Sequence, residues 1–300
     1  MSTFDKIDLV YTWVDGSLPG YLEERQQYSE KPLDMNPERY RDTFQTLKYS
    51  LRSVDMYLPW INNILIVTNR PQVPAWLNLA HPKVRIVHLD EFIPEAFLPT
   101  FCSNAIECFL HLLPGLSEHF IYMNDDFFFG KPTVLEDFWS DGKYTVFNTF
   151  FGENLKWRIY DQKNNIVGLG LIEHGPHFAR KSYWQEMTEM LPDEVQATRS
   201  RKFRHPDNLV TFKLYRRYML EKHRDISRAV PIWDFVRLCF FHKITNNFTA
   251  TERGLRKINT IKPKFFCLND DQRSDPNPEV VRSVKLFLDQ YFPTPSPYER

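Results

Sequence analysis

The feature that most constrains the fold is the repeated order of apolar strand and amphipathic helix in the first 124 residues. Four segments rich in β-branched and aromatic residues are predicted strands: 7–13, 63–68, 83–88 and 119–124. Apolar residues at helical spacing predict helices over 38–58 and 103–113, and a short helix is expected to begin at 74–77. A chain that alternates in this way is expected to form a mainly parallel sheet with both faces covered.

The pattern beyond residue 140 is less regular. A strand is predicted over 144–151, and helices are predicted over 182–190, 209–221 and 280–291. No repeat, low-complexity segment or composition shift marks a linker. We therefore predict that residues 1–300 form a single α/β domain with helical insertions in its second half.

Charge and cysteine content exclude several classes of protein. Lys plus Arg and Asp plus Glu both number 38, and this balance argues against a nucleic-acid or anionic-membrane binder. The four cysteines lack Cys-x-x-Cys spacing, which argues against a zinc site and favours a reducing compartment. No signal peptide and no apolar run of membrane-spanning length are apparent. We expect a cytoplasmic protein, with peripheral attachment to a membrane complex left open.

Two adjacent carboxylates, Asp125 and Asp126, follow the strand over 119–124. Carboxylates repel each other and are costly to desolvate, so a pair at the end of an apolar strand needs a compensating cation. The strand ends of open α/β sheets face the ligand crevice, where Mg²⁺ or Mn²⁺ commonly holds substrate phosphates. In a regular strand the two side chains would point to opposite faces, and we then prefer Asp126 as the metal ligand. The alternative is a polar turn without a metal.

Several segments resemble the Stealth family of sugar-1-phosphate transferases and occur in the order of that family. That family includes bacterial capsule polysaccharide phosphotransferases and the catalytic portion of the lysosomal-enzyme N-acetylglucosamine-1-phosphotransferase. The resemblance covers nearly the whole chain and is carried by residues 7–16, Arg41-Asp42 with 47–53, 98–107, 120–126, His174-Gly-Pro-His177, 203–207, 266–270 and 291–296.

The resemblance implies a Rossmann-like, GT-A-like fold of the nucleotide-sugar glycosyltransferase type. It also implies a nucleotide-sugar donor, whose sugar-1-phosphate passes to a saccharide acceptor hydroxyl with release of a nucleoside monophosphate. Such chemistry needs positioned phosphates, neutralised charge and a base near the incoming hydroxyl. Substrate-binding roles are assigned by resemblance to Asp15, Arg41, Asp42, Arg52, Asn104, Glu107, His177, His205, Asp207 and Asn269.

Catalytic roles also follow from the resemblance. His174 is the predicted general base or phosphate contact, since imidazole titrates near neutrality. Arg204 is predicted to stabilise charge on the transferring phosphoryl group. Asp125 and Asp126 are predicted catalytic carboxylates, and Asp270, from a loop after 264–267, is the candidate second metal ligand beside Asp126.

For several of these residues, a purely structural role is the alternative to a role in the site. Asp15 sits in a Val-Asp-Gly turn that it would cap by itself, and Asp207 would cap a helix. Glu107 would be a surface residue of an amphipathic helix. Two other functions also remain open: a metal-dependent glycosyltransferase that releases nucleoside diphosphate, and a non-catalytic polysaccharide-binding subunit whose aromatic residues stack on sugars.

Overall fold

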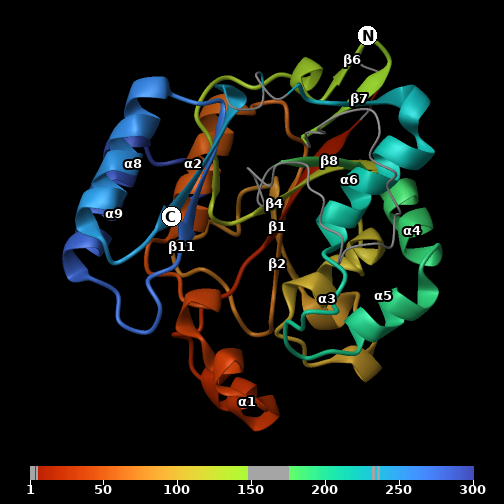
Figure 1. The fold of residues 1–300 in the computed structure, drawn as a ribbon, viewed down its shortest axis with the longest axis horizontal. Helices are drawn as coiled ribbons and strands as arrows, with labels where there is room; N and C mark the ends of the chain where they lie inside the picture. The colour runs from red at the N-terminus through yellow and green to blue at the C-terminus, as the bar shows by residue number, and fades with distance from the viewer. Residues whose placement is uncertain (1–3, 5, 148–175, 232–233, 235–236) are drawn as a thin grey trace.

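The computed structural model describes residues 4, 6–147, 176–231, 234 and 237–300. Its central sheet has the strand order β3-β2-β1-β4-β8, seen near the middle of Figure 1. These strands are β1 (Ile7–Thr12), β2 (Ile64–Thr68), β3 (Val84–His88), β4 (His119–Asn124) and β8 (His177–Arg180). β1 to β4 run parallel, whereas β8 pairs antiparallel with β4. The predicted α/β class and mainly parallel Rossmann-like sheet are confirmed.

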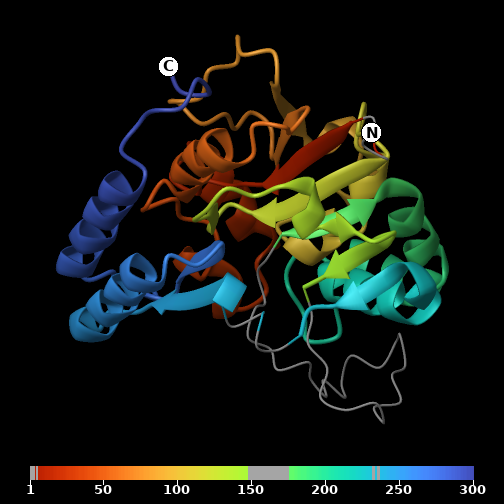
Figure 2. The ribbon, with the colours of Figure 1, turned by 90° about the horizontal axis from the view of Figure 1, so that it is seen from above.

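The helices form two groups on either side of this sheet. In Figure 1, α3 to α6 lie together on one side, and α8 and α9 lie on the other beside β11; Figure 2 shows the same separation from above. The helices are α1 (Tyr21–Tyr28), α2 (Thr46–Tyr57), α3 (Ser103–Glu107), α4 (Lys181–Glu189), α5 (Pro192–Arg199), α6 (Thr211–Lys222), α8 (Phe248–Ile261) and α9 (Pro278–Tyr291). The second half of the chain therefore supplies most of the long helices, as predicted.

Two smaller sheets complete the described architecture. One has the order β10-β11-β5, with β10 parallel and β5 antiparallel to β11, and the other has the order β6-β7-β9. Their strands are β5 (Phe127–Phe129), β6 (Trp139–Ser140), β7 (Lys143–Val146), β9 (Ser227–Ala229), β10 (Cys239–Ile244) and β11 (Phe265–Asp270). β4 and β5 are separated by only two residues, so the chain passes from one sheet to the next at Asp125 and Asp126.

Helix α2 joins the central sheet to the sheet that contains β5. Its apolar face, with Leu47, Leu51 and Val54, is fully buried. On the same helix, the hydroxyl of Ser50 donates to the backbone oxygen of Phe127 at 2.6 Å and lies 2.7 Å from the hydroxyl of Tyr11. These buried hydrogen bonds fix α2 between β1 and β5, because breaking them would leave buried polar groups without partners.

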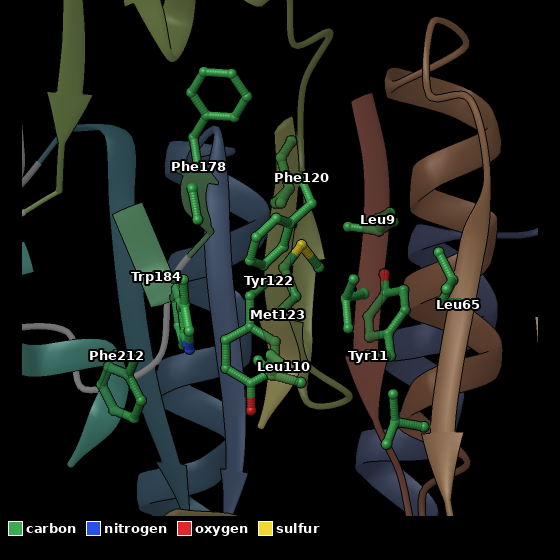
Figure 3. Packing of buried hydrophobic residues seen from close by; sticks show 14 of the residues in the cluster. Leu9, Tyr11, Leu65, Leu110, Phe120, Tyr122, Met123, Phe178, Trp184 and Phe212 are labelled. Atoms are coloured by element: carbon green, nitrogen blue, oxygen red, sulfur yellow. The ribbon is translucent and has the colours of Figure 1, made fainter. Parts of the chain in front are cut away.

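The core lies around β1 and β4 and explains their nearly continuous apolar sequence. Leu9 and Tyr11 of β1 and Phe120, Tyr122 and Met123 of β4 are completely buried. Figure 3 shows these side chains among further core residues from neighbouring elements. Strands that are covered on both faces require apolar residues at consecutive positions rather than in alternation.

Local predictions failed where tertiary contacts decide the backbone. The helix predicted over 38–58 begins only at Thr46, and residues 37–39 form a separate 3₁₀ turn. The helix predicted over 103–113 splits into α3 and a 3₁₀ turn, and residues 74–77 do not form a helix. The loop expected after 264–267 is the end of strand β11, because the backbone of residues 268–270 still pairs with β10. Of the strand predicted over 144–151, residues 144–146 belong to β7, Phe147 follows the strand, and residues 148–151 lie outside the described residues. The assignment of one domain to residues 1–300 stays a prediction.

Candidate active site

A cleft lies where the carboxyl ends of β1, β2, β4 and β11 meet the loop that precedes α2. Its empty space, open mouth included, is about 1100 Å³. Ligand crevices of open α/β sheets occur at this end of the strands. Charged and amide side chains that line the cleft include Arg39, Arg41, Asp42, Asn124, Asp125, Asp126, Arg204, Asn269 and Asp270.

Asp125 and Asp126 form the turn between β4 and β5, and both are partly buried. The Asp125 Oδ2 atom accepts a hydrogen bond from the Thr46 hydroxyl at 3.4 Å. The Asp126 Oδ2 atom accepts one from the Asn269 carboxamide nitrogen at 3.1 Å. The pair therefore contacts different elements, α2 and β11, as expected for adjacent side chains that diverge. The structure brings Asn269 to Asp126 although 143 residues separate them.

Asp270 ends β11 and is held by Arg41. The guanidinium of Arg41 donates from Nε to Oδ2 at 2.6 Å and from Nη2 to Oδ1 at 2.8 Å. This two-point pairing is the strong geometry for arginine and carboxylate. The structure thus brings two predicted site residues into the cleft, but as partners of each other.

The donor atoms of the cleft suit a hard divalent cation. Asp126 and Asp270 offer carboxylate oxygens, and the buried Oδ1 atom of Asn124 has no hydrogen-bond partner in the described ranges. Among the described residues there is no ready-made cluster of three or more histidine, cysteine or acidic ligands. Mg²⁺ commonly uses one or two carboxylates and completes its shell with water and substrate phosphates, so the set fits such an ion. Full coordination by Asp270 would require Arg41 to release an oxygen.

Arginine side chains face the same cleft without acidic partners. Arg204 donates from Nη2 to the Ser103 hydroxyl at 2.8 Å. Arg39 also lines the cleft, and its pKa is lowered by burial and then by the positive charges of Arg204 and Arg25. Within the described part of the chain, neither Arg39 nor Arg204 makes an ion pair with a carboxylate. Arginines that line a cleft without a carboxylate in ion-pair contact are suited to an anionic ligand such as a diphosphate.

Arg39 was not among the site residues predicted from the sequence. The arginine stands two residues before Arg41, and its position in the cleft depends on the 3₁₀ turn over 37–39. The sequence feature that could have indicated a site residue is this second arginine close to Arg41. The sequence pattern alone did not separate it from an exposed charge, because helical spacing predicted a continuous helix there.

Asp42 lies on the cleft wall under the indole of Trp13. The Trp13 Nε1 atom donates to the Asp42 Oδ2 atom at 3.2 Å. Burial raises the pKa of Asp42 to about 7, against the opposing effect of this hydrogen bond. The nearby negative charge of Asp15 raises it further. The site therefore holds a carboxyl group that titrates near neutrality.

Arg52 does not line the cleft, in contrast to its predicted substrate-binding role. Its side chain is buried and pairs with Glu299 through Nε at 2.9 Å and Nη2 at 2.8 Å. A third donor, Nη1, binds the backbone oxygen of Phe292 at 2.8 Å. Arg52 holds the C-terminal segment against α2, because all of its directional donors point toward that segment.

Asn104, Glu107 and His177 do not line the cleft, in contrast to their predicted substrate-binding roles. The buried Glu107 accepts a hydrogen bond from the Tyr122 hydroxyl at 3.1 Å, and Tyr122 in turn lies 3.1 Å from the hydroxyl of Thr12. His177 is buried in β8, and the carbonyl of Asn104 accepts a hydrogen bond from α6. Two hydrogen bonds therefore link Glu107 through Tyr122 to Thr12, which lines the cleft.

Asp15, His205 and Asp207 lie on loops outside the cleft lining. The Asp15 Oδ1 atom accepts from the backbone N–H of Ser17 at 2.9 Å, as in the turn-capping alternative. His205 and Asp207 are exposed and contact each other, since the Asp207 N–H donates to His205 Nδ1 at 3.2 Å. His174 lies outside the described residues. The substrate-binding roles of these residues stay predictions.

The fold and cleft define a Rossmann-like α/β protein that gathers acidic and basic side chains at its strand ends. Family models for four conserved regions of the Stealth proteins match the chain in order: region 1 at 5–32, region 2 at 39–147, region 3 at 173–221 and region 4 at 256–300. The chain belongs to the Stealth family.

Relatives with similar sequences are named exopolysaccharide phosphotransferases. A protein of Streptomyces coelicolor is 32% identical over 98% of this chain and 51% of its own length. CpsY of Mycobacterium tuberculosis is 35% identical over 98% of this chain and 58% of its own length. The chain thus spans between half and three-fifths of the length of these two relatives.

Solved structures with a similar fold are glycosyltransferases. The galactosyltransferase LgtC, in complex with donor and acceptor sugar analogs, is 9% identical, with a TM-score of 0.45 over 95% of this chain and 96% of that chain. GlyE of Streptococcus pneumoniae is 10% identical, with a TM-score of 0.42 over 96% of this chain and 64% of that chain. Across the described residues, no helix is long and apolar enough to cross a membrane.

Proposed function

We propose that this chain transfers hexose-1-phosphate from a nucleotide diphosphate sugar, most simply a UDP-sugar, to a saccharide hydroxyl. The products are a phosphodiester and a nucleoside monophosphate. The observation that carries the proposal is that Asp125, Asp126 and Asn269 line the same cleft as Arg39 and Arg204. Carboxylates and arginines that line one cleft suit a diphosphate that is held by a cation and by guanidinium groups.

The roles of the residues follow from the charge that develops during transfer. Phosphoryl transfer depends on positioning and on neutralisation of the oxygens around phosphorus. Arg204 and Arg39 bind the diphosphate oxygens, and Arg204 stabilises the transferring group. Mg²⁺ or Mn²⁺, held by Asp126 with Asp270, would supply positive charge to the phosphates. Asn269 orients Asp126 through their hydrogen bond, and His174 acts as general base or phosphate contact.

The names of the relatives support a role in synthesis of exopolysaccharide or capsule phosphodiesters. The saccharide acceptor is then a growing chain or its precursor. We further propose a cytoplasmic site of action, where nucleotide sugars are made, with peripheral attachment to a membrane-bound capsule complex.

The test distinguishes the nucleotide that is released. The protein is incubated with UDP-glucose, UDP-galactose or UDP-N-acetylglucosamine, neutral oligosaccharide acceptors and Mg²⁺ or Mn²⁺, and the nucleotides are separated by chromatography. UMP is the expected product, together with a ³¹P signal of a phosphodiester. Release of UDP would contradict the proposal and indicate an ordinary glycosyltransferase. Absence of turnover with every donor would contradict it in favour of a polysaccharide-binding subunit.

Two variants make the same experiment specific to the cleft. Asp126→Asn should lower UMP release by at least 100-fold, since it removes a ligand charge from the phosphate site. Asp141→Asn is the matched control, because the Asp141 side chain is 87% exposed in the turn between β6 and β7. Chelation by EDTA should abolish activity, and Mg²⁺ or Mn²⁺ should restore it.

A further inference from the structure

Asp42 carries a buried carboxylate oxygen that lacks a hydrogen-bond partner in the part of the chain that the structure describes. Its Oδ2 atom accepts from the Trp13 indole at 3.2 Å, whereas its Oδ1 atom is buried and has no hydrogen-bond partner among the described residues. A buried carboxylate oxygen without a partner is costly, and native structures contain few of them. Because Asp42 lines the cleft, a ligand hydroxyl in the cleft is the natural partner for this atom.

The charges around Asp42 leave it uncompensated. The neighbouring Arg41 binds Asp270 with two donors, and no described lysine, arginine or histidine makes an ion pair with Asp42. Asp15 is close enough to raise the pKa of Asp42, and the more distant Lys285 lowers it slightly. Burial is the largest influence and raises the pKa to about 7. At neutral pH the group is therefore divided between its charged and neutral forms.

Thr46, at the start of α2, links Asp42 to Asp125 at the end of β4. The backbone of Thr46 lies near enough to lower the pKa of Asp42, while the Thr46 hydroxyl donates to Asp125 at 3.4 Å. The first turn of α2 thus contacts both acidic groups. A hydroxyl that approaches phosphates held near Asp125 passes close to Asp42.

We propose that Asp42 is the general base that removes the proton from the acceptor hydroxyl. This inference depends on the proposed function. The hydroxyl oxygen forms a bond to the phosphorus that carries the sugar, and the bond from this phosphorus to the nucleotide oxygen breaks. The leaving nucleoside monophosphate takes that electron pair, and the hydroxyl proton passes to Asp42. Asp42 returns the proton to water after product release, and His174 then serves as a phosphate contact.

The first experiment is a pH–rate profile of UMP release with the UDP-sugar panel described above. A general base must be ionised, so the rate of the wild type should rise with pH and level off above about 7. Asp42→Asn should lower the maximal rate by about 100- to 10,000-fold and remove this rise, while the KM for donor stays similar. An active Asp42→Asn enzyme that keeps the same rise would overturn the inference but leave the proposed function intact.

Two neighbouring substitutions should move the profile in opposite directions. Trp13→Phe removes a hydrogen bond to the ionised carboxylate, so the pKa rises and the profile shifts to higher pH. Asp15→Asn removes a nearby negative charge, so the pKa falls and the profile shifts to lower pH. Equal profiles for the two variants would contradict Asp42 as the titrating group, because a purely structural residue would produce no such opposite shifts.

A substrate-free measurement keeps the inference testable if the donor panel gives no turnover. The ¹³C carboxyl resonances of the labelled protein are titrated with and without Asp42→Asn, which identifies the signal of Asp42. We expect this signal to titrate near neutrality and to shift when a UDP-sugar and Mg²⁺ are added. A midpoint near 4 would overturn the inference, since so acidic a group is a poor proton acceptor at neutral pH.

Discussion

Replacement of Asp42 by asparagine should change how stability depends on pH. The free energy of unfolding of Asp42→Asn, compared with that of the wild type, should increase as the pH rises from 5 to 8. Burial raises the pKa of Asp42 from its ordinary value of 3.8 to about 7 in the folded state. Below about pH 4 the group is protonated in both states and has no effect. Between about pH 4 and 7 the unfolded chain ionises while the folded protein does not, so wild-type stability is lost as pH rises.

The size of this effect follows from the change in pKa. The folded value exceeds the unfolded value by about 3, and each unit corresponds to about 1.4 kcal/mol, which gives an upper bound of about 4 kcal/mol. Between pH 5 and 8, the stability advantage of Asp42→Asn over the wild type should grow by about 3 kcal/mol. Only the change with pH is interpreted, because the contacts of the new amide add a constant offset.

Urea denaturation followed by circular dichroism at half-unit pH steps measures the effect. The fitted free energies of unfolding are compared between the wild type, Asp42→Asn and the exposed control Asp141→Asn. The difference for Asp42→Asn should rise between pH 5 and 7 and then remain constant, while that for Asp141→Asn stays nearly flat. Parallel curves for the wild type and Asp42→Asn would refute the claim that burial perturbs this carboxyl group.

Three other substitutions test separate parts of the structure. Arg52→Met should lower stability by about 1.5–3 kcal/mol, because Glu299 loses its two-point partner and keeps Lys48 at 3.6 Å as its remaining cation among the described residues. Arg52→Lys should lose less. Thermal unfolding measures both variants, and unchanged melting would contradict the anchoring role. Arg39→Met should weaken the binding of a UDP-sugar with Mg²⁺ by about tenfold or more, measured by calorimetry, without altering the melting temperature. Unchanged affinity would show that Arg39 does not bind the diphosphate. Gly254→Ala should destabilise the protein by about 1–3 kcal/mol in urea, since the new Cβ collides with the imidazole of His242, and a neutral effect would show that the ring moves easily.

Part of the site could be predicted from local sequence. An apolar run that ends in Asp125 and Asp126 predicts a buried strand whose carboxylates lie at its end, since parallel strands open at that edge. The structure places both residues in the cleft. Asp15 shows the limit of this reasoning: the same strand-end logic suggested a ligand contact, but its side chain binds the Ser17 N–H. Local geometry allowed both outcomes.

Arg41 and Arg52 show what local spacing did not predict. Arg41 precedes α2 and Arg52 belongs to it. By family resemblance, both were predicted to bind substrate. Their partners, Asp270 and Glu299, lie 229 and 247 residues away in the chain. Which arginine faces the cleft therefore depends on where β11 and the C-terminal segment pack, and Figure 2 shows that segment running from α9 toward the central sheet.

The amino-acid sequence by itself determined the α/β class, the mainly parallel sheet and the Stealth membership. These properties follow from short-range apolar periodicity and from motifs read in order along the chain. The tertiary structure alone decided that Asn269 meets Asp126, that Arg39 lines the cleft and that Asp42 is partly buried and bonded to Trp13. Burial and pairing between distant segments set the charge state of each group, and those quantities depend on the packed fold rather than on neighbours in sequence.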